Sequence, residues 1–255
     1  MSVGITDTEP VAAPGHAAPA ARRRALRWVL ALLALILAGA LAVGVEGAVR
    51  RTLEPHPDGP DRVDALLVLY SQPAVYDAAL DLLGAGVADR VFVSAHLGPD
   101  GHEKLCGEPA KADPRLHGVT VECFSPDPVT TQGEVMFAGE RMRALGLQDL
   151  GVLTFGEHLE RARLLARRCW PEEEGTVSMY EFDAGYDDGV RARQAAYAVL
   201  AYGKAGLTPG CGDELPGVVR WPLDLAKRAL GMPVEAAVRT AGVRPVGVAL
   251  AETSA

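Results

Sequence analysis

An uncharged, apolar run from Trp28 to Val45 constrains this chain more than any other feature of its sequence. The run is 18 residues long, within the range that lets a helix span a bilayer (~17–25 residues). A buried helix of a soluble domain is rarely apolar on every side, because one side usually faces water. We therefore predict a transmembrane helix with basic flanks over residues 22–51. The preceding tail, residues 1–21, is rich in Ala and Pro and is predicted to be disordered.

The charges beside the run predict its orientation. Four arginines lie within residues 22–27, directly before the run, whereas two, Arg50 and Arg51, lie shortly after it. By the positive-inside rule, the amino terminus then lies in the cytoplasm and the rest of the chain lies outside the membrane. A cleaved signal peptide is the alternative, with small-residue cleavage sequences at 38–40 or 40–42. The run is long for a signal core (~7–15 residues), so we expect a retained single-pass anchor in the cytoplasmic membrane.

The two parts of the chain differ in charge. The whole chain has 33 acidic and 25 basic residues and a net charge of −8, but residues 1–51 hold six arginines against three carboxylates. Residues 52–255 therefore carry a net charge of −11. Such an acidic domain is unsuited to nonspecific binding of nucleic acid or of an anionic lipid surface. An anionic ligand would have to be captured by a local site.

All four cysteines lie beyond the apolar run. An even number of cysteines in an oxidising compartment favours disulfide bonds. Of the three pairings that four cysteines allow, proximity in the sequence favours Cys106 with Cys123 and Cys169 with Cys211. Metal binding is the alternative, and the absence of a C-x-x-C spacing makes it the weaker one.

Short apolar runs alternate with helical patterns after a Pro-rich segment at residues 52–62, which we expect to link rather than to pack. The alternation predicts that residues 63–255 form a Rossmann-like α/β domain, an open parallel sheet flanked by helices. The expected strands lie at 63–70, 91–93, 119–121, 151–155 and 176–180, and the expected helices at 74–83, 131–145, 157–169, 188–204 and 222–230.

Polar residues are concentrated where the expected strands end. Ligands of an open parallel sheet bind beyond the carboxyl ends of its strands. That rule selects the loops that contain Ser71, Ser94, residues 122–134 and residues 156–158. We therefore expect one composite site at this edge of the sheet.

His158 and Arg161 are three residues apart near the start of an expected helix, and hence share a face. The positive end of the helix dipole favours an anion there. The histidine could act as an acid, a base or a nucleophile, and the arginine could bind a phosphate or carboxylate. The alternative is a surface histidine beside an arginine that pairs with Glu157.

A second polar cluster, Thr130, Thr131 and Glu134, lies at the start of another expected helix. Thr131 and Glu134 fit a capping box, in which hydroxyl and carboxylate satisfy the first amides of a helix. Alternatively, the hydroxyls of Thr130 and Thr131 contact a ligand. The sequence contains no Walker loop, G-x-G-x-x-G or G-x-S-x-G motif, and it indicates no particular cofactor or metal.

Three segments, 64–69, 130–134 and 152–162, carry a resemblance to a known family. Their order, and the His-x-x-Arg-Ala sequence after a strand that ends in Val-x-Thr, resemble the ElyC/SanA/YdcF-like domain, which includes the vancomycin high-temperature exclusion protein. The resemblance covers about residues 62–182. It implies a Rossmann-type fold, often on one membrane anchor, with a role in envelope barrier function or in lipid-carrier and peptidoglycan metabolism. The site residues that it implies are Thr131, Glu134, His158, Arg161, Ser94 and the Ser71–Gln72 turn.

Two functions agree with these observations. The first is an anchored enzyme of the cell envelope that acts on a phosphorylated or lipid-linked precursor, with His158 as acid or base and Arg161 binding the anion. The second is a non-catalytic module that binds such a ligand or an envelope partner. The loops after the first two strands lack the glycines common in the family, which favours the second function, because glycine allows close backbone approach to a phosphate.

Overall fold

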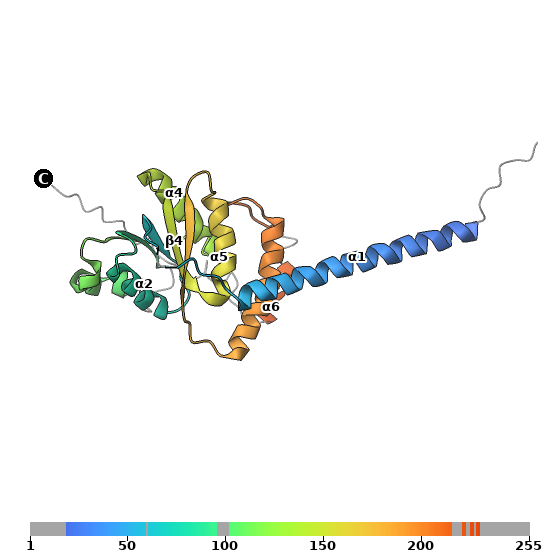
Figure 1. The fold of residues 1–255 in the computed structure, drawn as a ribbon, viewed down its shortest axis with the longest axis horizontal. Helices are drawn as coiled ribbons and strands as arrows, with labels where there is room; N and C mark the ends of the chain where they lie inside the picture. Colours follow the sequence, from blue (N-terminus) through green and yellow to red (C-terminus); the bar gives the residue numbers. More distant parts are fainter. Residues whose placement is uncertain are drawn as a thin grey trace, which may run out of the picture. The chain divides into compact units, whose positions relative to one another are not determined.

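The computed structural model describes residues 19–59, 61–95 and 102–215, and, further on, residues 221–222, 225–226 and 228–229. The chain divides into two units, one that ends at Gly44 and one that begins at Val45. The second unit contains a five-stranded parallel sheet with helices on both faces (Figure 1).

Helix α1, Pro19–Leu53, contains the apolar run. Its most apolar stretch is not buried in the described part of the protein, and Trp28 and Leu37 each expose 71% of their surface. A helix that is apolar on every side and lacks a protein partner suits a lipid environment. By length and composition, α1 is a helix that could cross a membrane, as the sequence predicts.

The sheet is all parallel, with the strand order β3-β2-β1-β4-β5. This order reverses direction after the third strand, so β1 and β4 are neighbours and form the topological switch point of the sheet. The Rossmann-like architecture predicted from the sequence is confirmed. The strands are β1 (Ala65–Val68), β2 (Arg90–Ser94), β3 (Thr120–Phe124), β4 (Asp149–Phe155) and β5 (Thr176–Phe182).

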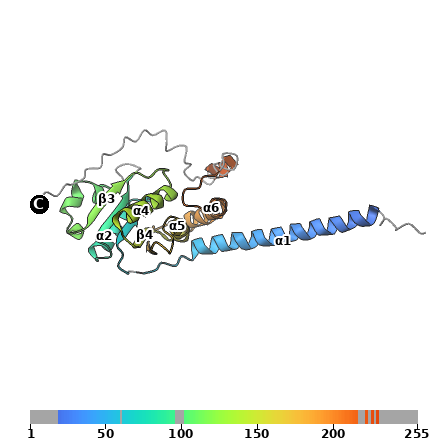
Figure 2. The same ribbon diagram turned by 90° about the horizontal axis from the view of Figure 1, so that it is seen from above.

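The central strand β1 is buried on both faces, which explains its continuous apolar sequence. Leu66 and Val68 pack on the face covered by α2, whereas Ala65 and Leu67 pack on the face covered by α4 and α5. Figure 2 shows these helices on opposite sides of the sheet, and α6 lies beside α5.

Most helices lie where the periodicity of the sequence places them. The boundaries of α4 are those expected, and α5 begins one residue earlier than expected. The expected helix at 222–230 lies largely outside the described residues, although the described ones among them are helical. The helices are α2 (Ala74–Gly84), α3 (Glu103–Cys106), α4 (Thr131–Leu145), α5 (Gly156–Cys169) and α6 (Asp188–Leu207), with short 3-10 helices at Glu108–Ala112 and Pro114–Leu116.

The Pro-rich segment after α1 packs against the domain, contrary to the expectation that it only links. The backbone N–H of Asp58 donates to the carbonyl of Met179 at 3.0 Å, and the Met179 N–H donates to the Asp58 carboxylate at 2.7 Å. Arg163 on α5 pairs with the same carboxylate at 2.6 Å. The segment therefore covers part of β5, an edge strand whose backbone groups would otherwise face solvent.

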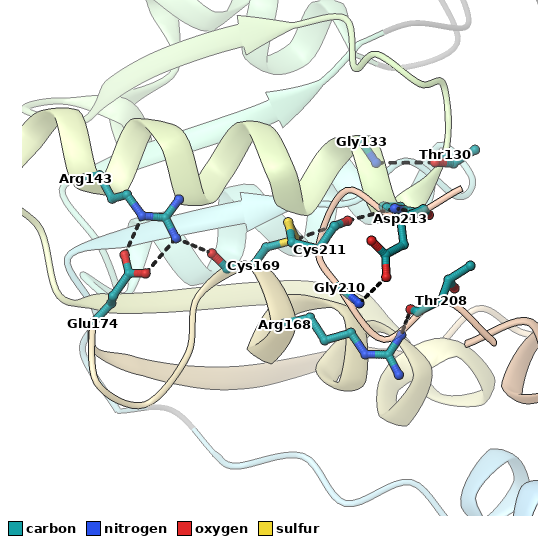
Figure 3. The surroundings of a disulfide bond; sticks show 11 residues. Thr130, Gly133, Arg143, Arg168, Cys169, Glu174, Thr208, Gly210, Cys211 and Asp213 are labelled. Atoms are coloured by element: carbon teal, nitrogen blue, oxygen red, sulfur yellow. Dashed lines mark hydrogen bonds and ion pairs between the residues drawn. A yellow bond between two sulfur atoms is a disulfide. The ribbon is translucent and has the colours of Figure 1, made fainter. Parts of the chain in front are cut away.

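Two disulfide bonds form, with the pairing expected from the proximity of the cysteines in the sequence. Cys106–Cys123 joins α3 to β3, and Cys169–Cys211 joins the end of α5 to the segment after α6. Figure 3 shows Cys211 beside α4, where Gln132 donates to the Cys211 carbonyl at 2.7 Å. The second disulfide thus fixes the segment after α6 over the outer side of α4 and α5.

Gly133, in the first turn of α4, permits a close approach that a side chain would prevent. A Cβ atom at this position would collide with the carbonyl oxygen of Pro128 in the preceding loop. The glycine therefore sets how the loop after β3 enters α4.

We predict that Gly133→Ala destabilises the fold by about 2 kcal/mol or more, because backbone has to move to admit the methyl group. The matched control is Gly203→Ala in α6, where a Cβ atom meets open space. Helix propensity alone should make that variant neutral or more stable. Chemical denaturation of both full-length variants in detergent measures the difference; equal stability of the two would contradict the prediction.

Candidate functional site

The candidate site lies at the switch point, where β1 and β4 end and where α4 and α5 begin. The structure brings together Thr131 and Glu134 from α4 with His158 from α5 and Ser94 from the end of β2. Open parallel sheets bind ligands at this position because the loops on either side of a switch point diverge. Of the residues expected from the sequence to form a composite site, these four are therefore brought together.

His158 is buried, with 4% of its surface exposed, and both ring nitrogens have partners. Its Nδ1 lies 3.0 Å from the Thr154 hydroxyl, and its Nε2 lies 3.4 Å from the Thr131 hydroxyl. Burial, and to a lesser extent the positive charge of Arg161, lowers the pKa of His158 well below its usual range. The imidazole is therefore neutral at physiological pH.

Glu134 is the other buried ionisable group of the site, with 3% of its surface exposed. Its carboxylate accepts the backbone N–H of Tyr70 at 2.9 Å and a hydrogen bond from the side chain of Ser94. Burial raises the pKa of Glu134 to about 7, and these two hydrogen bonds only partly offset the effect. The carboxyl group is thus able to gain or lose a proton near neutral pH.

The helix cap at the start of α4 differs from the capping box expected for Thr131 and Glu134. Thr130 is the capping residue, with extended backbone and a hydroxyl that accepts the N–H of Gly133 at 3.3 Å. Thr131 is consequently inside the helix, and Glu134 lies one position beyond that of a capping-box carboxylate. Both side chains are therefore free to face the ends of β1 and β4.

Arg161 lies one turn after His158 and stacks on Tyr197 of α6, with its guanidinium carbon 4.8 Å from the ring centroid. The expected alternative, an ion pair between Arg161 and Glu157, is wrong, because Glu157 pairs with Arg191 at 2.9 Å. Within the described part of the chain, the half-buried Arg161 guanidinium makes no ion pair or hydrogen bond. Its burial lowers its pKa.

Two features near the site leave hydrogen-bond donors without a side-chain acceptor among the described residues. The Ser71 hydroxyl, which follows β1, is buried and has no partner among these residues. Phe155 precedes α5 and provides no side-chain cap for the first amides of the helix. Unpaired donors at a helix start favour an anionic or acceptor-rich ligand.

Two contacts of the site were not expected from the sequence: that of the Thr154 hydroxyl, and that of the backbone N–H of Tyr70, although Tyr70 lies in the loop selected after the first strand. Thr154 lies on β4 and is completely buried, and its hydroxyl orients His158 four residues later. A hydroxyl residue at the end of an apolar strand sequence was the signal that could have indicated Thr154 as a site residue. Tyr70 contributes only its backbone N–H to Glu134, so no side-chain pattern could have revealed it.

The arrangement combines a neutral histidine, a carboxyl group that titrates near pH 7 and the cation of Arg161, which has no acidic partner among the described residues. It can donate hydrogen bonds to an oxyanion and can exchange a proton with a ligand. In the described residues, no group of three or more His, Cys, Asp or Glu side chains is placed to hold a metal ion. No protein-family model, curated protein or solved structure matches the chain.

We predict that Glu134→Gln removes a pH-dependent part of the stability. Because the fold raises the pKa of Glu134 from 4.5 to about 7, the carboxyl group stabilises the fold fully below pH 4.5 and this stability is lost as pH rises through 7. Relative to the variant, the free energy of unfolding of the wild-type protein should fall by about 3 kcal/mol between pH 4.5 and 8.

Denaturant titrations of the full-length chain in detergent, at several pH values, measure the difference in free energy of unfolding between the wild-type protein and Glu134→Gln. The matched control is Glu140→Gln, which removes an exposed carboxylate from the same helix. This control should follow the wild-type pH dependence. A constant difference between the wild-type protein and Glu134→Gln across the whole range would contradict the prediction.

Proposed function

We propose that the chain is a single-pass protein of the cell envelope, with a cytoplasmic amino terminus and an α/β domain outside the cytoplasmic membrane. Three features support this topology. Helix α1 has the length and composition of a membrane span, more arginines precede its apolar run than follow it, and the four cysteines all form disulfides. Disulfides persist in oxidising compartments and are rare in the cytosol.

This topology predicts the state of the thiols in cells. After cells are denatured in acid, the full-length chain should form no adduct with a polyethylene-glycol maleimide. It should form four adducts only after its disulfides are reduced. The control Cys169→Ser leaves Cys211 without its partner and should gain one adduct before reduction. Four adducts on the unreduced wild-type chain would place the domain in a reducing compartment and contradict the topology.

We further propose that the site at the switch point binds a phosphorylated ligand, such as a lipid-linked cell-wall precursor. The observation that carries the proposal is a set of donors that lack acceptors within the described residues: the start of α5, which has no side-chain cap, the Ser71 hydroxyl and the guanidinium of Arg161. Phosphate oxygens accept several hydrogen bonds at once and match this set. The envelope role itself draws on the resemblance of residues 62–182 to ElyC/SanA/YdcF-like domains.

In an enzyme, Glu134 would be the group that exchanges a proton, because the pKa of its carboxyl is raised to about 7. Burial instead keeps His158 neutral, which suits a hydrogen-bond donor better than the acid or base expected from the sequence. Its ring would hold an oxygen of the ligand, and Arg161 would balance the negative charge.

A non-catalytic binding module is the second candidate, and one contact favours it. The Tyr70 N–H at the end of β1, where a phosphate-binding loop would present a free amide, is occupied by the Glu134 carboxylate. A module returns a bound precursor unchanged, whereas an enzyme converts it, so product analysis separates the two candidates.

Phosphate binding by the wild-type protein should become tighter at low pH relative to binding by Glu134→Gln. As pH falls from 8 to 6, Glu134 gains a proton and its negative charge no longer repels the ligand, whereas His158 remains neutral. Calorimetric titration of the full-length chain in detergent, first with inorganic phosphate and then with a prenyl phosphate, measures the affinity. Phosphate itself also gains a proton in this range, so Glu134→Gln, which retains only that effect, is the reference against which the gain is measured.

Arg161→Ala should weaken phosphate binding by roughly 10-fold or more, because it removes a charge-assisted hydrogen bond. Arg167→Ala, which removes an exposed arginine from the same helix, is the matched control and should leave the affinity unchanged. Equal affinities of the Arg161→Ala variant and the wild-type protein would refute the role of this arginine. Failure of both phosphates to bind would refute the proposed ligand class.

A further inference from the structure

The contact between Thr154 and His158 determines more than the position of the ring. Thr154 is completely buried on β4, and its hydroxyl oxygen lies 3.0 Å from His158 Nδ1. Within the described part of the chain, this hydroxyl has no other hydrogen-bond partner. A neutral imidazole carries one proton, on either Nδ1 or Nε2, and the surrounding hydrogen bonds decide which nitrogen holds it.

The two arrangements of this contact differ in cost. If Nδ1 carried the proton and donated to Thr154, the hydroxyl proton of Thr154 would be buried without an acceptor, which is unfavourable. If Thr154 donates to Nδ1 instead, both groups are satisfied and the imidazole proton is on Nε2. That proton then points towards the start of α4, where the Thr131 hydroxyl lies 3.4 Å from Nε2.

We propose that Thr154 is a positioning residue that donates its hydroxyl proton to His158 Nδ1 and thereby holds the histidine as a hydrogen-bond donor through Nε2. The long contact to Thr131 leaves this N–H available to a stronger acceptor, such as a phosphoryl oxygen. The use of the N–H by a ligand rests on the function proposed above, but the tautomer does not.

Nuclear magnetic resonance of the ring nitrogens tests the tautomer directly. The chain has six histidines, so full-length protein labelled with 15N-histidine in detergent micelles gives few signals, and His158→Gln identifies the signal of His158. At pH 7.5, we expect the proton on Nε2 and an unprotonated Nδ1. A proton on Nδ1 of the wild-type protein overturns the proposal, whatever the variants do.

Substitutions of Thr154 test the origin of the tautomer. Thr154→Val keeps the shape of the side chain but removes the hydroxyl, so the Nδ1 resonance should move and phosphate binding should weaken roughly 5-fold. Thr154→Ser restores a hydroxyl and should return the Nδ1 resonance towards the wild-type position. An unchanged Nδ1 resonance in Thr154→Val would overturn the role of Thr154.

A matched control separates this role from a general effect of losing a buried hydroxyl. Thr208→Val also removes a buried threonine hydroxyl, which donates to the Lys204 carbonyl at 3.0 Å, and it should leave the His158 signals unchanged. If the tautomer is found as proposed but phosphate does not bind, the proposed function fails and the role of Thr154 stands.

Discussion

Burial of β1 on both faces is the constraint on which the rest of the domain depends. A strand with no face towards water needs helices on both sides of the sheet, and a parallel sheet obtains them through crossovers that run in opposite directions from its centre. Here α2 crosses on one side, and α4 and α5 cross on the other. The starts of α4 and α5 consequently meet above the ends of β1 and β4. The position of the candidate site therefore follows from the same apolar strand that forms the core.

The chemical character of the site follows from how deeply its polar groups are buried. Burial disfavours charge on both ionisable groups, so Glu134 tends to keep a proton near neutral pH and His158 tends to lose one. The hydrogen bonds from Tyr70 and Ser94 hold the carboxyl group without fully stabilising its charge. Arg161 keeps its charge because an arginine does not deprotonate in proteins, and the face of Tyr197 supports it. At the start of α5, the carboxylate of Glu157 is paired with Arg191, and the positive charge of Arg161 lies close enough to His158 to lower its pKa further.

The sequence predicted the elements well, because their signals are local. The apolar spacing in residues 131–145 predicted both ends of α4, and the continuous apolar run predicted the strand β1. Contacts that depend on tertiary structure were harder to predict. Thr131 with Glu134 three residues later matches a capping box in the sequence, but the extended backbone of the adjacent Thr130 makes that residue the cap. The partner of Glu157 is distant in the sequence, on α6, so no local pattern could show that Arg161 lacks one.

The contact of Asp58 with β5 also bears on how copies of the chain can associate. An exposed edge strand offers unpaired backbone groups to the edge strand of another copy, and two such edges can pair into an extended sheet. At one edge, the segment after α1 occupies backbone groups of β5. At the other edge, β3 is short, is tied to α3 by Cys123 and carries the charged Glu122. Both edges of the sheet are therefore protected against strand pairing between copies of the chain, so domains at high local concentration can stay separate.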